Sequence, residues 1–123
     1  MMLSRKGGLK FVARTPTVGT DFSLPFFTWD GTWHNLDMSA IVPIKAKAVL
    51  VEVGLCWNQV GNQVFLRHPD DTNANGAIQF RQTLVSQRHY RTVLMPVKNA
   101  TISYKTWNGT GQYFNWVILG WFV

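Results

Sequence analysis

The sequence predicts an all-β protein, a single jelly-roll-like antiparallel β-sandwich with an extended N-terminal arm. Apolar and polar residues alternate along much of the chain, and Gly-, Pro- and Asn-rich clusters interrupt them about every 8 to 15 residues. No window of useful length keeps the i, i+3, i+4, i+7 spacing of an amphipathic helix. Many short strands with such turns are typical of sandwiches and jelly rolls. A chain of 123 residues suffices for one domain with an ordinary core.

The first expected element is a basic arm over residues 1–20, followed by the sandwich over residues 21–123. The arm contains no acid and ends in the turn-rich sequence RTPTVGT. Its basic residues are Arg5, Lys6, Lys10 and Arg14.

Five strands are then expected before the last segment. AKAVLVEVGLCW (46–57) alternates clearly, and NQVFLRH (62–68) follows the turn-like NQVG as the second strand of a hairpin. The next three are AIQFRQTL (77–84), RTVLMPV (91–97) and ATISYK (100–105). Pro43 and Pro96 are expected at strand ends or edges, because proline cannot donate a hydrogen bond to a ladder.

The last segment, QYFNWVILGWFV (112–123), is apolar on both faces when read with a period of two. Leaving one such face in water would forfeit about 6–12 kcal/mol of burial energy. This strand therefore lies either at the centre of one sandwich or against a second subunit, and the sequence leaves both open. In the second case the interface residues are Phe114, Trp116, Ile118 and Phe122.

The charge distribution favours an acidic partner. The formal net charge is +6, all six acids lie between Asp21 and Asp71, and only Arg and Lys carry charge after that. Such a balance suits either nucleic acid or an acidic protein surface. No stretch reaches the roughly 18 apolar residues of a membrane helix, and no signal peptide is apparent. The single Cys56 excludes an intramolecular disulfide and is expected to be buried and inert.

No motif indicates catalysis, and no cofactor is implied. DTNANG (71–76) matches the first half of a calcium loop, but its twelfth position is Gln82 rather than Glu, so we expect a polar loop. His34 and Asp37 would lie on opposite faces of a strand, which argues against a metal or acid–base pair. The three histidines, His34, His68 and His89, share no zinc-ligand spacing.

Two binding functions remain from the residues alone. Basic residues and aromatics are interleaved after residue 80, a pattern that suits single-stranded nucleic acid binding, but no RRM, KH or cold-shock signature is present. We therefore expect nucleic acid not to be the partner. Trp107 in the Gly-rich KTWNGTGQY could instead stack on a sugar.

One run is more specific than composition. DGTWHNLDMSAIVPIKAKAVLVEV (30–53) resembles a pattern in small β-domains of tailed-bacteriophage virion proteins, which reads roughly DGTWH-x-LDLS-x-IVP-x-GAKAVL. ISYK (102–105) resembles the penultimate strand of those domains, and Gly120-Trp121 resembles their closing GW pair. The resemblance covers about residues 28–123. Ile44-Lys45 stands where the pattern has a turn-favouring Gly, so that loop is expected to differ.

The resemblance implies a sandwich or jelly-roll module of the virion surface, often trimeric, as in capsid decoration proteins, head fibres and tail-fibre tips. The chain has no shaft-like segment, so we expect a non-enzymatic capsid decoration (cement) protein. It would be made in the host cytoplasm, form homotrimers and pair its basic arm with the major capsid protein. The alternative is a tail- or head-fibre module whose loops 57–63, 69–76 and 106–112 contact host glycan, Trp107 included.

Overall fold

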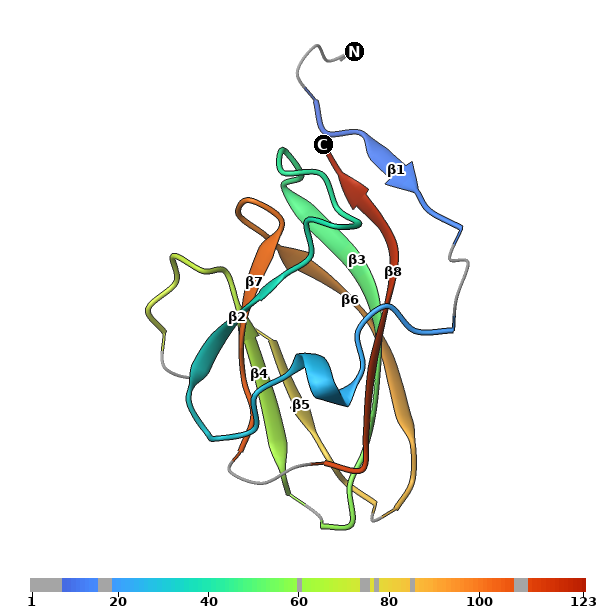
Figure 1. The fold of residues 1–123 in the computed structure, drawn as a ribbon, viewed down its shortest axis with the longest axis vertical. Coiled ribbons are helices and arrows are strands. Elements are labelled where there is room, and N and C mark those ends of the chain that lie inside the picture. The colour runs from blue at the N-terminus through green and yellow to red at the C-terminus, as the bar shows by residue number, and fades with distance from the viewer. Residues whose placement is uncertain are drawn as a thin grey trace.

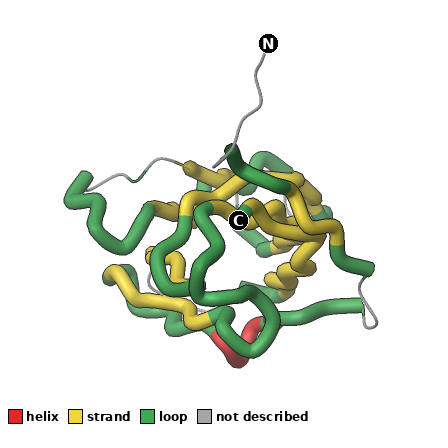
Figure 2. Tube along the Cα trace, turned by 90° about the horizontal axis from the view of Figure 1, so that it is seen from above, coloured by secondary structure: helices red, strands yellow, loops and turns green. Residues whose placement is uncertain are grey.

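Two antiparallel four-stranded sheets lie face to face in the computed structural model (Figure 1). It describes residues 8–15, 19–59, 61–73, 76, 78–84, 86–107 and 111–123. The sheet orders are β1-β8-β3-β6 and β2-β7-β4-β5. Seen from above, strands and loops make up nearly the whole described chain, and a single short helical segment lies at one side (Figure 2). The predicted all-β sandwich is confirmed.

Six of the strands overlap the alternating segments of the sequence, but the hairpin expected between 46–57 and 62–68 does not form, because these two strands belong to different sheets. The first sheet contains β1 (Phe11–Ala13), β3 (Ala48–Cys56), β6 (His89–Pro96) and β8 (Tyr113–Phe122). The second contains β2 (Trp33–Asp37), β4 (Gln63–Arg67), β5 (Ile78–Arg81) and β7 (Thr101–Lys105). A 3-10 turn, η1 (Leu24–Phe26), precedes β2. No helix among the described residues is long and apolar enough to cross a membrane.

The core lies between the inner faces of β3 and β8 and those of β4 and β7. Phe114, Trp116 and Ile118 of β8 are 0% exposed and belong to the same cluster as the inward residues of β3. The second sheet contributes Leu66, Ile102 and Tyr104. Predicting a subunit interface at Phe114, Trp116 and Ile118 is therefore wrong, because one chain's own two sheets enclose them.

A β-bulge explains why the last strand is apolar on both faces. Val51 pairs with Ile118 but Leu50 pairs with Gly120, so Leu119 is an extra residue on β8. Beyond an extra residue the side chains exchange faces. Trp121 consequently pairs opposite a core residue and packs against the core. Phe122 turns to the outer face beside Phe11, with 5.1 Å between ring centroids.

The other edge of β8 is covered by the N-terminal part of the chain. β1 pairs with the last residues of β8, and further along Phe22 forms an isolated bridge with Trp116. Between them the Asp21 carboxylate accepts a hydrogen bond from Ile118 N at 2.8 Å. These contacts satisfy an edge that would otherwise offer unpaired backbone groups. The described part of the predicted arm thus lies within the sheet.

Asp21 is held by Arg14, one of the predicted arm residues. Arg14 Nη1 and Nη2 lie 2.6 and 2.9 Å from the two carboxylate oxygens, and the Asp21 side chain is 3% exposed. Burial alone would raise the pKa of Asp21. The hydrogen bonds from Arg14 and Ile118, together with the charge of Arg14, outweigh burial and leave this pKa below its usual value.

Replacing Asp21 with Asn should lower the free energy of unfolding at pH 7 by about 2–4 kcal/mol. The substitution leaves a partly buried guanidinium without its counter-charge and weakens the acceptor for Ile118 N. Urea unfolding of both proteins measures the difference. Asp70→Asn is the matched control, because it removes an ion pair with Lys98 whose side chains are more than half exposed and should change stability by about 0.5 kcal/mol or less.

The contribution of Asp21 to the stability of the fold changes with pH in a definite direction. Because folding lowers the pKa of Asp21, its contribution is complete above the unfolded value of about 3.9 and is lost as pH falls through the folded value. Asp21→Asn should therefore lose stability less steeply than the wild type below about pH 4. Parallel declines in the two proteins would contradict this role of Asp21.

Candidate functional site

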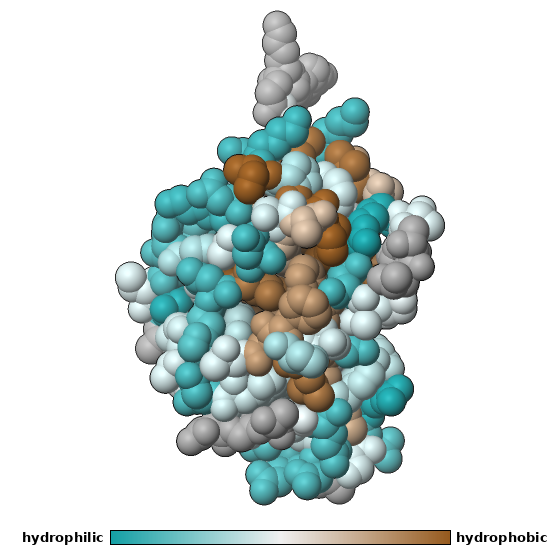
Figure 3. Space-filling view, viewed as in Figure 1, coloured by the Kyte–Doolittle hydropathy of each residue, from teal (hydrophilic) through white to brown (hydrophobic). Residues whose placement is uncertain are grey.

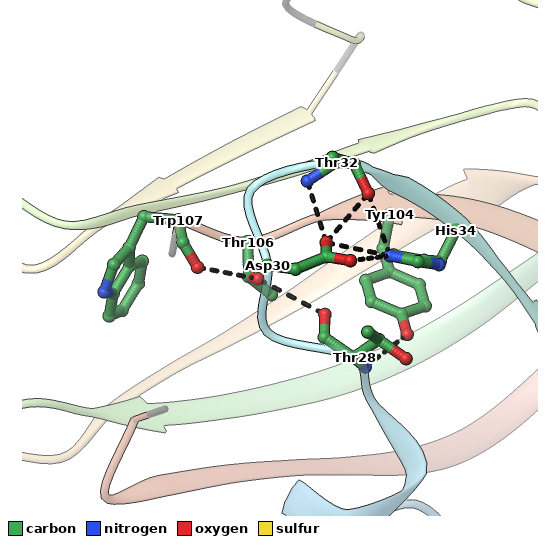
Figure 4. A network of polar contacts seen from close by, with 7 residues as sticks. All are labelled: Thr28, Asp30, Thr32, His34, Tyr104, Thr106 and Trp107. Atoms are coloured by element: carbon green, nitrogen blue, oxygen red, sulfur yellow. Dashed lines mark hydrogen bonds and ion pairs between the residues drawn. The ribbon is translucent and has the colours of Figure 1, made fainter. Parts of the chain in front are cut away.

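The DGTWH sequence forms the turn that begins β2. Asp30 Oδ1 accepts hydrogen bonds from Thr32 N at 3.0 Å and from Thr32 Oγ1 at 2.8 Å, and His34 Nε2 lies 2.9 Å away (Figure 4). Gly31 has a φ of 78°, a left-handed conformation that suits glycine. The hydrogen bonds lower the pKa of Asp30 to about 2, and the contact with His34 contributes most. This motif is thus a self-contained turn.

The geometry of this turn differs from that of a catalytic triad. In a triad the carboxylate holds histidine Nδ1 and leaves Nε2 for the nucleophile. Here both Asp30 and Thr32 contact the same Nε2 of His34, so no relay passes through the ring. Asp37, at the far end of β2, accepts instead from Ser39 N at 2.8 Å. His34 and Asp37 therefore form no pair.

Beside the turn, Trp107 packs into a cluster of three tryptophans. Its ring centroid lies 4.0 Å from that of Trp57 and 5.7 Å from that of Trp29. Thr106 Oγ1 donates to Trp107 O and Thr28 O, and Tyr104 OH accepts from Thr28 N (Figure 4). These hydrogen bonds join β7 and the residues after it to the segment that precedes β2. Trp107 is half-buried, so part of its indole is used for packing. Residues 108–110 of its loop lie outside the described residues.

The three loops predicted to contact glycan do not converge. Gln112 N donates to Cys56 O, which joins the loops after β3 and β7 at one end of the sandwich. The loop after β4 lies at the opposite end, where Lys98 forms an ion pair with Asp70 at 3.0 Å. Cys56 is buried, as expected, and its Sγ lies 3.6 Å from the side-chain oxygen of Gln112.

The calcium-like sequence also folds as a polar loop. Asp71 Oδ1 accepts from Asn73 N, and Gly76 has a φ of 69°. Gln82, at the twelfth position, is buried beyond the other end of β5, where it donates to Trp57 O. Asn75 lies outside the described residues. Among those described, no three His, Cys, Asp or Glu residues form a group that could hold a metal ion.

Of the aromatics counted toward nucleic acid binding, Tyr90 is 53% exposed, Trp107 belongs to the tryptophan cluster, and Tyr104 is buried in the core and not accessible. Trp33, on the outer face of the second sheet, has Arg67 Cζ 3.7 Å and Lys105 Nζ 5.2 Å from a ring centroid. A base would have to displace these cations, and Arg67 is also bound to Asn73 O at 2.6 Å. This face therefore gives single-stranded binding little support.

A mixed apolar and basic surface lies at the end of the sandwich that contains the C-terminus. We call it the terminal face: Leu9, Lys10, Phe11, Ile44, Lys45, Lys47 and Lys98. Lys10 N donates to Val123 O and Lys47 N donates to Phe122 O, which brings the two segments to the same strand end. Leu9, Phe11 and Ile44 are 63%, 40% and 57% exposed. Figure 3 shows apolar surface extending from this end along the middle of the molecule.

A groove of about 960 Å³ opens on the terminal face. It is lined by residues 43–47, by His68 and Asp70, and by residues 96–99. Three lysines line it against one acid, and that acid is paired with Lys98. The sequence did not indicate this groove, because its lining comes from three separate loops. The one local sequence signal of the groove is Ile44-Lys45, which stands where the phage virion pattern has a turn-favouring Gly.

The arm residues predicted to contact a capsid have different surroundings. Arg14 is bound to Asp21, and Lys10 lies exposed on the terminal face. Arg5 and Lys6 lie outside the described residues.

No protein-family model matches this chain, and no curated protein matches it. The function is therefore inferred from the geometry of the described surfaces and from the sequence resemblance.

Replacing His34 with Gln should raise the pKa of Asp30 from about 2 toward its usual value, because the main hydrogen bond that lowers it is weakened. Carboxyl ¹³C NMR across an acid titration measures this. Asp37 is the internal control, since its lowered pKa depends on Ser39 and should not change. An unchanged pKa of Asp30 would contradict the assigned contact.

Proposed function

We propose that this protein is a non-enzymatic structural protein of a bacteriophage virion surface, most specifically a capsid decoration (cement) protein. The residues that resemble the phage virion pattern occupy structural positions that suit a virion-surface module. DGTWH makes the turn into β2, AVLVEV belongs to the central β3, and Gly120 directly follows the bulge of β8. The strand orders are also those of an eight-stranded jelly roll, which favours that part of the prediction.

The observation that carries the proposal is the terminal face. Three large apolar side chains are exposed there beside lysines from the β1 segment and from two loops. Covering the exposed parts of Leu9, Phe11 and Ile44 would contribute roughly 3–5 kcal/mol. The lysines would give orientation and a faster encounter with an acidic shell. This combination at one end suits a protein that docks on a preformed capsid.

Docking through the terminal face predicts a charge-reversal phenotype. Lys45→Glu with Lys47→Glu should weaken binding to decoration-free phage heads at least tenfold, because both side chains are exposed beside the groove. Co-sedimentation at two salt concentrations measures binding. Arg88→Glu is the control, since Arg88 stacks on Tyr113, away from the groove. Equal binding by both variants would refute docking through this face.

Charge reversal is a sharper test than deleting residues 2–20. That deletion would also remove β1 and the Arg14 ion pair, and so would destabilise the fold itself. The receptor-binding alternative has one supporting feature, the partly exposed Trp107 in a loop. It predicts binding to host cells that Trp107→Ala abolishes, whereas a decoration protein should bind heads and not cells.

We expect the purified protein to be a homotrimer, with an interface that uses outer rather than inner side chains. Phe122 lies on the outer face of the first sheet, and Leu94, which is outside the terminal face, is 52% exposed there. Light scattering at two protein concentrations gives the absolute mass, and Leu94→Asp should reduce it to that of a monomer. A wild-type monomer at both concentrations would contradict trimer formation in solution.

A further inference from the structure

A second cavity lies on the opposite side of the sandwich from η1, between edge strands β5 and β6. Its volume is about 160 Å³. The floor of the cavity is formed by β3 and β6 on the inward side of the sheet. In these strands Val53 pairs with Arg91, and Leu55 pairs with His89. The lining residues are Val53, Leu55, Phe80, Arg81, His89, Tyr90 and Arg91.

His89 contributes a buried polar atom to this cavity. Its Nε2 is out of contact with water and has no hydrogen-bond partner among the described residues. An unpaired buried polar group costs about 1–3 kcal/mol. Histidine Nε2 is a donor or an acceptor according to the tautomer. In the Nε2–H tautomer, a ligand oxygen that accepts its hydrogen bond would remove this cost.

Two arginines, Arg81 and Arg91, line the same cavity, and one guanidinium nitrogen of Arg81 lies close to Gly61 in the loop after β3. Arg91 is positioned by one hydrogen bond, from Nη1 to Gln79 O at 3.1 Å, and by the Phe80 ring, 5.1 Å from Cζ. Its other N–H groups have no partner within the described parts of the chain. Neither Arg81 nor Arg91 forms an ion pair with a described carboxylate. The lining of the cavity thus contains two arginines and a buried histidine nitrogen.

We propose that this cavity binds a small carboxylate. Planar guanidinium groups match a carboxylate by paired N–H···O bonds, and His89 Nε2–H would supply a further donor. The apolar floor of Val53, Leu55 and Phe80 would contact a short carbon chain. The volume corresponds to about five water molecules at ~30 Å³ each, which exceeds what a bare ion needs.

The test is to titrate the full chain with butyrate, acetate and inorganic phosphate as separate probes. Amide NMR monitors each titration. Butyrate should give saturable shifts at residues 78–81 and 89–91 and bind at least threefold tighter than acetate, because its chain covers Phe80. Arg81→Gln and Arg91→Gln should each weaken butyrate binding at least fivefold. Arg88→Gln, which lies outside the cavity on Tyr113, should bind like the wild type.

Three outcomes would overturn the proposal. They are the absence of localised shifts with butyrate, equal affinity in the wild type and both cavity variants, and tighter binding of phosphate than of butyrate. Arg81 is exposed, so its variant should stay folded even if Arg91→Gln opens the seam. The spectrum of each variant without added anion verifies its fold. The result does not depend on whether the protein binds capsids.

Discussion

The structure depends on covering β8 along both of its edges and over its inner face. This strand is the longest among the described residues, and its inner side chains form the centre of the core. β3 pairs with one edge, while β1, Phe22 and the Asp21 carboxylate together cover the other. A strand so rich in large apolar residues would be an aggregation risk at an open edge. The N-terminal segment therefore covers an edge of the C-terminal strand that would otherwise be open.

The Arg14–Asp21 pair shows how a polar contact completes an apolar strand. The bulge at Leu119 interrupts the regular ladder, and Ile118 N beside it donates to a side chain rather than to another backbone carbonyl. A buried carboxylate needs a counter-charge, and Arg14 provides it while also donating to Ile118 O. The basic residue that a charge count assigns to a partner is thus used within the fold.

The surface features are distributed around a rigid sandwich. The terminal face combines apolar and basic side chains at one end, the tryptophan cluster lies in the loops at the other end, and the cavity lined by His89 and Arg91 opens between β5 and β6. Each is built from segments far apart in the sequence. This arrangement is common in sandwiches, where strands fix positions and loops and edges carry the binding groups.

The sequence by itself determined the all-β class, the six alternating strands and the polar nature of the 71–76 loop, because period-two burial and turn chemistry are local properties. It also identified DGTWH as a special segment, and all contacts of Asp30 in that turn lie within four residues. Only the tertiary structure decided which face of β8 is inside, since a single extra residue at Leu119 exchanges the faces and leaves no sequence signal. It also decided the fate of Arg14 and the grouping of Arg81, His89 and Arg91, because charges are neutralised or gathered by strand pairing across the fold.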